Sequence, residues 1–199
     1  MNTYLFEGGS SGIGAALACE LASAGAKLIL TATNEDKLNA SRERCLKFTK
    51  DVLIVKLDIT KIDEHQSALN KIIDHYGRVD ILVNNAGRYQ AALFVESDLS
   101  VDKSTFDINV FGPIALTQRV VNYWIANIQH GHIAVTSSVT SVLPAPTGAA
   151  YSATKHALDG YYDAIRCELY HRNISVTMIY PGPVATDMFA SAHTSEKGN

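Results

Sequence analysis

The sequence predicts an α/β fold built on one parallel, doubly wound sheet. Short apolar runs alternate with stretches of helical length along the chain, which is the pattern of strand–helix–strand units. Most of these runs contain few alternating polar residues, as is typical of strands buried on both faces. The 199 residues, 47% of them hydrophobic, suffice for one well-filled core. We therefore expect a single domain over residues 1–199, in which 189–199 form a disordered polar tail.

Six apolar runs are the predicted strands, and five helical stretches lie between them. The strands are Thr3–Phe6, Lys27–Thr31, Val52–Leu57, Val79–Val83, His132–Thr136 and Ser175–Ile179. The helices are Ile13–Ala24, Asn34–Lys47, Lys61–Tyr76, Ser104–Ile128 and Tyr151–His171. Gly25 and Gly77 close the first and third helices, and Gly112-Pro113 should kink or split the fourth.

Composition favours a small-molecule ligand in a reducing compartment. The net charge of -3 and the lack of Lys or Arg runs argue against nucleic acid and anionic membranes. The three cysteines are odd in number and widely spaced, which suggests neither a disulfide framework nor a zinc site. We expect no metal site, since His130 and His132 lack acidic or Cys neighbours. No apolar run reaches the ~18 residues of a membrane span, so the expected location is cytoplasmic.

A glycine-rich turn follows the first predicted strand. Gly8, Gly12 and Gly14 let the backbone turn tightly and approach a pyrophosphate, while the free amides of the next helix face the anion. The spacing alone fits a plain tight connection equally well. The apolar run before the turn and the amphipathic helix after it favour nucleotide binding.

Tyr151 and Lys155 are four residues apart, so on a helix they share one face. A fixed ammonium group beside a phenol favours the phenolate and makes the pair suitable for acid–base chemistry near neutral pH. The Pro-containing loop 143–148 can return the chain so that Ser138 lies beside the phenol. A lone Tyr-x-x-x-Lys is common by chance, and the rest of the chain must decide its role.

Taken together, the motifs resemble the short-chain dehydrogenases/reductases. They are Gly8-x-x-x-Gly12-x-Gly14, Asp58, Asn84-Asn85-Ala86-Gly87, Asn109, Ser138, Tyr151-x-x-x-Lys155 and Pro181-Gly182, in the family's order. The segments around Tyr151 and Pro181 look most like the subgroup of dehydrogenase/reductase family member 7 and the 11-beta-hydroxysteroid dehydrogenases. The resemblance implies a Rossmann-like sheet of about six strands, with the family's last strand missing at the C-terminus.

The resemblance also implies a proton path. Tyr151 would be the general acid or base, and Lys155 would lower its pKa and hold the nicotinamide ribose. Ser138 would bind the substrate carbonyl oxygen, and Asn109 would hold a water that links Lys155 to solvent. Simpler roles stay open for the other motifs: Asp58 as a helix cap, Asn84-Asn85 as a turn, Asn109 as an ordinary helix residue and Pro181-Gly182 as a loop break.

The cofactor implied by the resemblance is a nicotinamide dinucleotide. Its expected contacts are Gly8, Ser10, Ser11, Gly12, Ile13, Gly14, Thr33, Asn34, Asp58, Ile59, Asn85, Ala86, Gly87, Tyr151, Lys155, Pro181, Gly182, Val184 and Thr186. Residues 31–34 contain no carboxylate, and Ser10, Thr33 and Asn34 could donate to a 2′-phosphate. This favours NADP(H) over NAD(H), although no cation occupies the usual place.

Two departures from the family keep more than one function open. Glu7 replaces the usual Thr before the first glycine, where a carboxylate is costly to bury and could weaken the contact with the Asn-Asn-Ala-Gly turn. The chain also stops before the family's substrate-covering helices. The leading hypothesis is an NADP(H)-dependent oxidoreductase acting on a carbonyl or secondary alcohol of steroid, retinoid or xenobiotic type.

The alternatives are a truncated, catalytically inactive isoform or fragment that acts through nucleotide binding or subunit pairing, and an epimerase or dehydratase of the same fold. The helical stretches 104–128 and 151–171 correspond to the family's dimer interface, so we expect a homodimer. The apolar residues of the first of them could serve the core or the interface.

Overall fold

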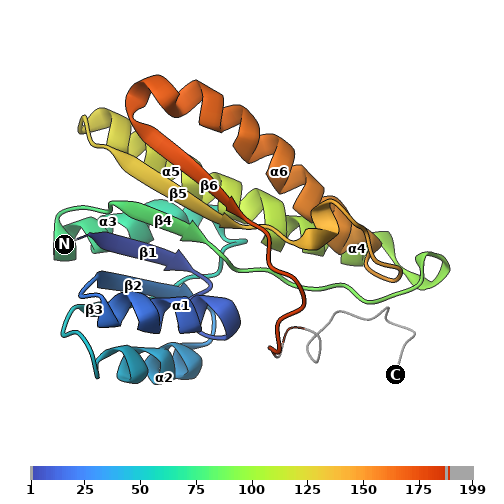
Figure 1. Ribbon diagram of the computed structural model, residues 1–199, viewed down its shortest axis with the longest axis horizontal. Coiled ribbons are helices and arrows are strands. Elements are labelled where there is room, and N and C mark those ends of the chain that lie inside the picture. The colour runs from blue at the N-terminus through green and yellow to red at the C-terminus, as the bar shows by residue number, and fades with distance from the viewer. Residues whose placement is uncertain (1, 187, 189–199) are drawn as a thin grey trace.

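The computed structural model describes residues 2–186 and 188, and their six strands form one sheet in which every neighbouring pair is parallel (Figure 1). The strand order is β3-β2-β1-β4-β5-β6. The strands are β1 (Thr3–Glu7), β2 (Lys27–Ala32), β3 (Val52–Lys56), β4 (Ile81–Asn84), β5 (Gly131–Thr136) and β6 (Ile174–Ile179). The predicted Rossmann-like sheet is confirmed. The tail predicted at 189–199 lies outside the described residues.

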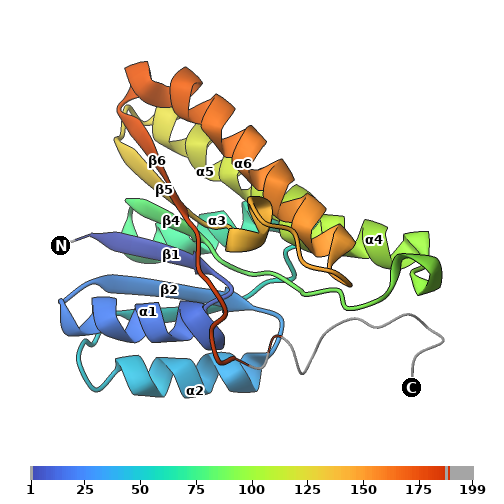
Figure 2. The same cartoon turned by 45° about the vertical axis from the view of Figure 1, so that its right-hand side comes forward.

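Helices cover the sheet in two layers, which Figures 1 and 2 show from two directions. The helices are α1 (Gly12–Ser23), α2 (Glu35–Cys45), α3 (His65–Tyr76), α4 (Leu99–Phe106), α5 (Gly112–Ala126) and α6 (Ala149–Leu169). Helices α1 and α2 pack on one face of the sheet, whereas α3, α5 and α6 contribute to the core on the other face. Within residues 2–186, no helix combines the length and the apolar character that crossing a membrane requires.

The central strands supply both cores because successive side chains point to opposite faces. Leu5 packs into the layer of α3, α5 and α6, and the next residue, Phe6, packs against α1 and α2. In β2, Ile29 and Leu30 divide in the same way. All four side chains are at most 1% exposed. At about 1.5–3 kcal/mol for each large apolar side chain removed from water, these strands anchor the fold.

Burial on both faces, predicted for most strands, is wrong for β5 and β6. Their buried residues alternate with exposed or half-exposed ones, among them His132 on β5 and Ser175 and Thr177 on β6. The physical reason is coverage: α1 and α2 lie over β1, β2 and β3, and within the described chain β6 is an edge strand (Figure 2). One face of this part of the sheet is therefore open in the described structure.

The long helix predicted at 104–128 begins earlier and changes type near Gly112-Pro113. It starts at Leu99, where the side chain of Asp98 accepts a hydrogen bond of 2.7 Å from the Ser100 amide. A π-helical stretch, Asp107–Phe111, then joins α4 to α5. The helix thus accommodates Gly112-Pro113 by a short π-helical segment, and such segments are frequent at functional sites. Gly112 is needed here because an added Cβ would lie 2.6 Å from the Ile59 carbonyl oxygen.

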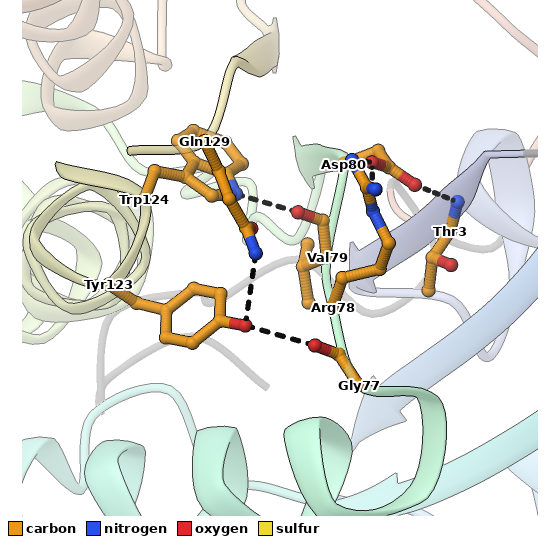
Figure 3. Close-up of polar contacts among 8 residues, drawn as sticks. All are labelled: Thr3, Gly77, Arg78, Val79, Asp80, Tyr123, Trp124 and Gln129. Carbon is orange, nitrogen blue, oxygen red and sulfur yellow. Dashed lines mark hydrogen bonds and ion pairs between the residues drawn. The ribbon is translucent and has the colours of Figure 1, made fainter. Parts of the chain in front are cut away.

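The turn between α3 and β4 fixes the amino end of the sheet (Figure 3). The buried Trp124 of α5 donates its indole N–H to the Val79 carbonyl at 2.7 Å, and Asp80 accepts from the Thr3 amide at 2.8 Å. Gly131 packs so closely on Trp124 that an added Cβ would lie 2.3 Å from the indole ring. These contacts hold β1 and β4 side by side, which brings their carboxyl ends together at the opposite edge.

Candidate functional site

A cavity of about 650 Å³ opens where the first four strands end. Parallel strands present all their carboxyl ends at one edge, which is where α/β sheets bind ligands. The cavity brings together many of the predicted cofactor residues. They are Gly8, Ser10, Ser11, Gly12, Ile13, Thr33, Asp58, Ile59, Asn85, Ala86, Gly87 and Thr186.

The glycine-rich turn requires glycine for two different reasons. Gly8 and Gly12 have φ values of +81° and +55°, in the left-handed region where side chains are strained. Gly14 has no such angle, but an added Cβ would lie 2.2 Å from the Gly8 carbonyl oxygen. The Ser11 side chain makes no capping hydrogen bond to α1. The amino end of α1 therefore faces the cavity as a site suited to an anion.

Asn84 and Asn85 connect β4 to its neighbours and are more than a plain turn. The Asn85 side chain donates to the Gly8 carbonyl at 3.1 Å and accepts from the Thr136 hydroxyl at 3.1 Å. Asn84, which is 3% exposed, donates to the hydroxyls of Thr117 and Tyr162 at 2.8 and 2.9 Å. The turn after β4 is thus fixed against β1, β5, α5 and α6.

Glu7 is 2% exposed, and its carboxylate accepts a hydrogen bond of 2.8 Å from the Ala86 amide. Burial raises the pKa of Glu7 to about 7, against the opposing effects of the Ala86 and Asn85 amides and the Lys155 charge. The raised pKa is the effect expected of a buried carboxylate. The expected weakening of the contact between β1 and the turn after β4 is corrected, because the carboxylate makes that contact itself.

The residues of the predicted proton path converge from α6, the segment after β5 and the π-helical stretch. Tyr151 and Lys155 are 8% and 3% exposed, and the Lys155 Nζ lies 5.5 Å from the centre of the Tyr151 ring. The ammonium group donates to the Thr136 carbonyl at 2.8 Å. Burial lowers the pKa of Lys155 to about 8, although the charges of Glu7 and Asp159 oppose that shift.

The structure differs from the expected effect of Lys155 on Tyr151. Burial raises the pKa of the Tyr151 phenol, and the influence that lowers it is a hydrogen bond with the side chain of Ser138. The neighbouring Tyr89, whose ring lies 5.0 Å from that of Tyr151, raises it further. In this structure the phenol is therefore held above its ordinary pKa, and the Lys155 ammonium is directed to the Thr136 carbonyl.

Asn109 is fully buried and braces the wall of the cavity. Its amide nitrogen donates to the Arg88 carbonyl at 2.9 Å and to the Thr154 hydroxyl at 3.1 Å, and its oxygen accepts from the Arg88 amide at 2.8 Å. An added Cβ on Gly87 would lie 3.6 Å from that oxygen and 3.7 Å from the Lys155 Nζ. The proton-path residues thus adjoin the cavity at Gly87.

Some predicted cofactor residues stand apart from the cavity wall. Of the residues that the structure describes, Gly14, Asn34, Tyr151, Lys155, Pro181, Gly182 and Val184 do not line it. Asn34 instead caps α2, because its side chain accepts from the Lys37 amide at 2.9 Å. The Pro181 carbonyl accepts from the Val139 amide at 3.1 Å and ties the segment after β6 to the Ser138 loop. Asp58 lines the cavity as expected, but it is not a helix cap: its carboxylate accepts from the Thr60 amide at 3.0 Å within a turn, and the next helical turn begins at Ile62.

Lys37 and Arg88 line the cavity and were missed by the sequence reasoning. No cation occupies the usual place at the end of the second strand, but Lys37, in the first turn of α2, brings a positive charge to the cavity. The available signal was its place at the start of the helix that follows β2. Arg88 directly follows the Asn-Asn-Ala-Gly turn, so adjacency to the motif could have identified it.

Residues 2–197 match the family model for short chain dehydrogenase. The chain belongs to this family. Dehydrogenase/reductase SDR family member 7 of Mus musculus is 36% identical to this chain over 194 residues, which are 95% of the chain and 57% of the relative. The 11-beta-hydroxysteroid dehydrogenase-like 2 protein of Arabidopsis thaliana is 33% identical over 186 residues, 92% of this chain and 59% of that protein. The predicted subgroup is confirmed.

The fold of this chain is also that of a solved reductase. The 3-ketoacyl-(acyl-carrier-protein) reductase from Brucella melitensis, complexed with NADH, superposes with a TM-score of 0.90 at 25% identity. The match covers 96% of this chain and 79% of the reductase. The chain spans less than two thirds of the length of the curated relatives it matches.

Proposed function

We propose that this chain is an oxidoreductase that transfers hydride between NADP(H) and a carbonyl or secondary alcohol substrate. The observation that carries the proposal is the junction at Gly87, where a cavity with a glycine-rich anion site meets the Asn109 and Lys155 side chains. Tyr151 shares one face of α6 with Lys155, and the Ser138 side chain hydrogen-bonds the Tyr151 phenol. These contacts support a proton path that begins beside the cavity at Gly87.

A dinucleotide fits the donor set of the cavity. The left-handed Gly8 and Gly12 and the uncapped amino end of α1 suit a pyrophosphate, and Asp58 and Ile59 suit the adenine end. When bound, the nicotinamide supplies or accepts the hydride. The turn depends on glycine, because a Cβ on Gly8 would lie 2.6 Å from the Ala86 nitrogen and a Cβ on Gly14 would lie 2.2 Å from the Gly8 carbonyl oxygen.

The chain's own residues handle the proton. Tyr151 exchanges a proton with the substrate oxygen, and Ser138 binds the same oxygen and stabilises its developing negative charge. Burial holds the Tyr151 phenol in its protonated form, which suits a general acid in carbonyl reduction. In the oxidising direction, a ligand that draws the Lys155 ammonium from Thr136 toward the phenol would favour the phenolate.

The preference for NADP(H) is supported by the charge of the cavity. Lys37 lines it together with Thr33 and Ser10, and residues 31–34 contain no carboxylate. A 2′-phosphate would meet donors and a cation there, whereas a 2′-hydroxyl gains little from the cation.

Two variants test this preference. Lys37→Gln should weaken NADPH binding about tenfold and leave NADH binding nearly unchanged, and Ala32→Asp should repel NADPH in the same selective way. Lys47→Gln removes an equal charge from an exposed position and serves as the control. Equal weakening of both cofactors in Lys37→Gln, measured by fluorescence titration, would contradict the proposed preference.

An apolar substrate of steroid, retinoid or xenobiotic type is supported by the loops beside the proton path. Val142 and Leu143, which follow Ser138, are each 78% exposed. The neighbouring loop contributes Leu93, which is 51% exposed, and is joined to the first loop by a hydrogen bond of 3.0 Å from Ala92 to Thr147. Exposed apolar side chains around a polar reaction centre suit a large apolar substrate.

A homodimer through α5 and α6 is part of the same proposal. Phe111 and Ile125 remain 53% and 38% exposed, whereas Trp124 and Val120 belong to the core. Light scattering at micromolar concentration tests the dimer, and a monomeric mass would refute it. We place the protein in the cytoplasm, on the basis of its free cysteines Cys19, Cys45 and Cys167.

A non-catalytic role through nucleotide binding or subunit pairing is the second candidate. The open face of β5 and β6 favours it. Thermal unfolding with NADPH or NADH separates the two functions. At ~100 times its dissociation constant, a bound cofactor should stabilise the chain by about 2.7 kcal/mol. Turnover of a carbonyl substrate that disappears in Tyr151→Phe, while stabilisation remains, supports the enzyme. Stabilisation without turnover supports the second candidate.

A further inference from the structure

Glu7 is a buried titratable group that the proposed proton path does not use. It is the last residue of β1, directly before Gly8, and its carboxylate accepts from the Ala86 amide on the opposite side of the cavity wall. Gly8 and Ala86 pack so closely that a Cβ on Gly8 would lie 2.6 Å from the Ala86 nitrogen. Glu7 itself lines the cavity, so its carboxylate lies close to the space of the ligand.

The surroundings of Glu7 offer little to neutralise a charge. The charged group that faces it is Lys155 of α6, whose ammonium is bound to the Thr136 carbonyl, and the Tyr162 phenol of the same helix is also affected by the carboxylate. None of the ion pairs within the described chain includes Glu7. The carboxylate thus depends on two backbone amides and on a lysine that already has another partner.

An acceptor for a protonated Glu7 is present on the neighbouring strand. Asn84 is the register partner of Glu7 in the parallel pair of β1 and β4, so the two side chains lie on the same face of the sheet. Its side-chain oxygen is buried without a hydrogen-bond partner in the described structure, although its nitrogen has two. A carboxylic acid O–H donated to this oxygen would satisfy it, which an ionised carboxylate cannot do.

We propose that Glu7 is a proton-binding residue of the cofactor site, so that the chain takes up one proton at this carboxyl group when a dinucleotide binds. This inference rests on the proposed cofactor binding. The reason is electrostatic: the pyrophosphate brings two negative charges to a wall that already contains a buried carboxylate, and like charges favour the neutral form. One proton moves from solvent to a carboxylate oxygen, and no other bond changes.

Proton uptake should occur within a defined pH range. The free chain has a Glu7 pKa of about 7, and the ligand raises it further. At pH 6 the group is already mostly protonated, so binding takes up little. Above pH 7 each binding event takes up as much as one proton, and the dissociation constant rises by up to tenfold per pH unit. In a variant with an uncharged residue at position 7, the dissociation constant should not rise with pH in this way.

Titration calorimetry with NADH and NADPH at pH 8, in two buffers of different ionisation enthalpy, measures the uptake. Wild type should take up close to one proton, and Glu7→Gln should take up clearly less. Lys155→Met is the necessary second variant because Lys155, with a pKa of about 8, also titrates here. Since the Lys155 charge lowers the pKa of Glu7, this variant should still take up a proton, but the uptake should begin at a higher pH than in wild type. Glu43→Gln, a change in an exposed acid that does not line the cavity, should retain the full uptake.

Difference infrared spectroscopy distinguishes a carboxyl group from a lysine directly. Addition of NADH at pH 8 should produce the carbonyl band of a protonated carboxylic acid in wild type and not in Glu7→Gln. Binding without proton uptake and without this band would refute the inference and leave the proposed function intact. No binding of either nucleotide would refute the proposed function itself. The wild-type measurements decide the question even if a variant does not fold.

Discussion

Replacing Glu7 by glutamine should stabilise the free chain at alkaline pH and not at acid pH. The folded-state pKa of Glu7 is raised by burial from 4.5 to about 7. A group whose pKa is raised on folding favours the folded state in its protonated form. That contribution is complete below about pH 4.5 and is lost as the pH rises through about 7.

The size of the effect follows from the same shift. At ~1.36 kcal/mol per pKa unit, the rise corresponds to about 3 kcal/mol of unfolding free energy. Solvent screening reduces this free energy only slightly, because the Glu7 side chain is 2% exposed. Glutamine keeps the shape and an acceptor for the Ala86 amide but carries no charge. The advantage of Glu7→Gln over wild type should therefore grow by about 3 kcal/mol from pH 4.5 to pH 8.

Urea denaturation of both proteins at several pH values, followed by circular dichroism, measures this difference. Glu43→Gln is the matched control, since the Glu43 side chain is 68% exposed and its removal should give no such pH dependence. A difference between Glu7→Gln and wild type that stays constant from pH 4.5 to pH 8 would show that the reasoning about the buried carboxylate is wrong.

Three further predictions concern the glycine turn, the buried Trp124 and the reactivity of the cysteines. Gly14→Ala places a Cβ 2.2 Å from a carbonyl oxygen of the glycine turn and should abolish the NADPH-dependent rise in melting temperature; an unchanged rise would contradict the tight turn. Trp124→Phe leaves the buried Val79 carbonyl without its donor and should lower the unfolding free energy by about 1–3 kcal/mol in urea, beyond the loss of ring area. Burial raises the pKa of Cys45 to about 12, so iodoacetamide should alkylate the exposed Cys167 first and Cys45 last, as peptide mass spectrometry would report.

The fold was largely predictable because its signals are local. Apolar runs such as 27–31 gave the strands of the centre, and a left-handed glycine follows both α1 and α3 at the predicted places, Gly25 and Gly77. The prediction that both faces are buried was wrong for β5 and β6 because exposure depends on which helices cover the sheet. Ser175 and Thr177 alternate with apolar residues, a pattern typical of a strand with one covered face, but the sequence does not say which helices lie above them.

The cofactor end of the site was predictable for a geometric reason: motifs that follow parallel strands converge at one edge. The contacts that set the charges and pKa values of the site were not predictable from the sequence. The bond between Glu7 and Ala86 joins residues 79 positions apart, and it exists because β1 and β4 pair. The spacing of Tyr151 and Lys155 placed them on one face, but it carried no information on burial, which has the larger effect on both pKa values.

The strand order has a consequence for how the chain folds during synthesis. β1 lies at the centre and pairs with β2 and β4, so the glycine turn and the turn after β4 are both present in the chain once residue 87 has been made, although the side chains that fix the second turn, Thr117, Thr136 and Tyr162, are made later. Ser138, Tyr151 and Lys155 belong to segments made much later, beside β5 and β6. Pairing strands so distant in sequence is slow. We therefore expect β1, β2 and β4 to pair first, and the segments that carry Ser138, Tyr151 and Lys155 to join the sheet afterwards.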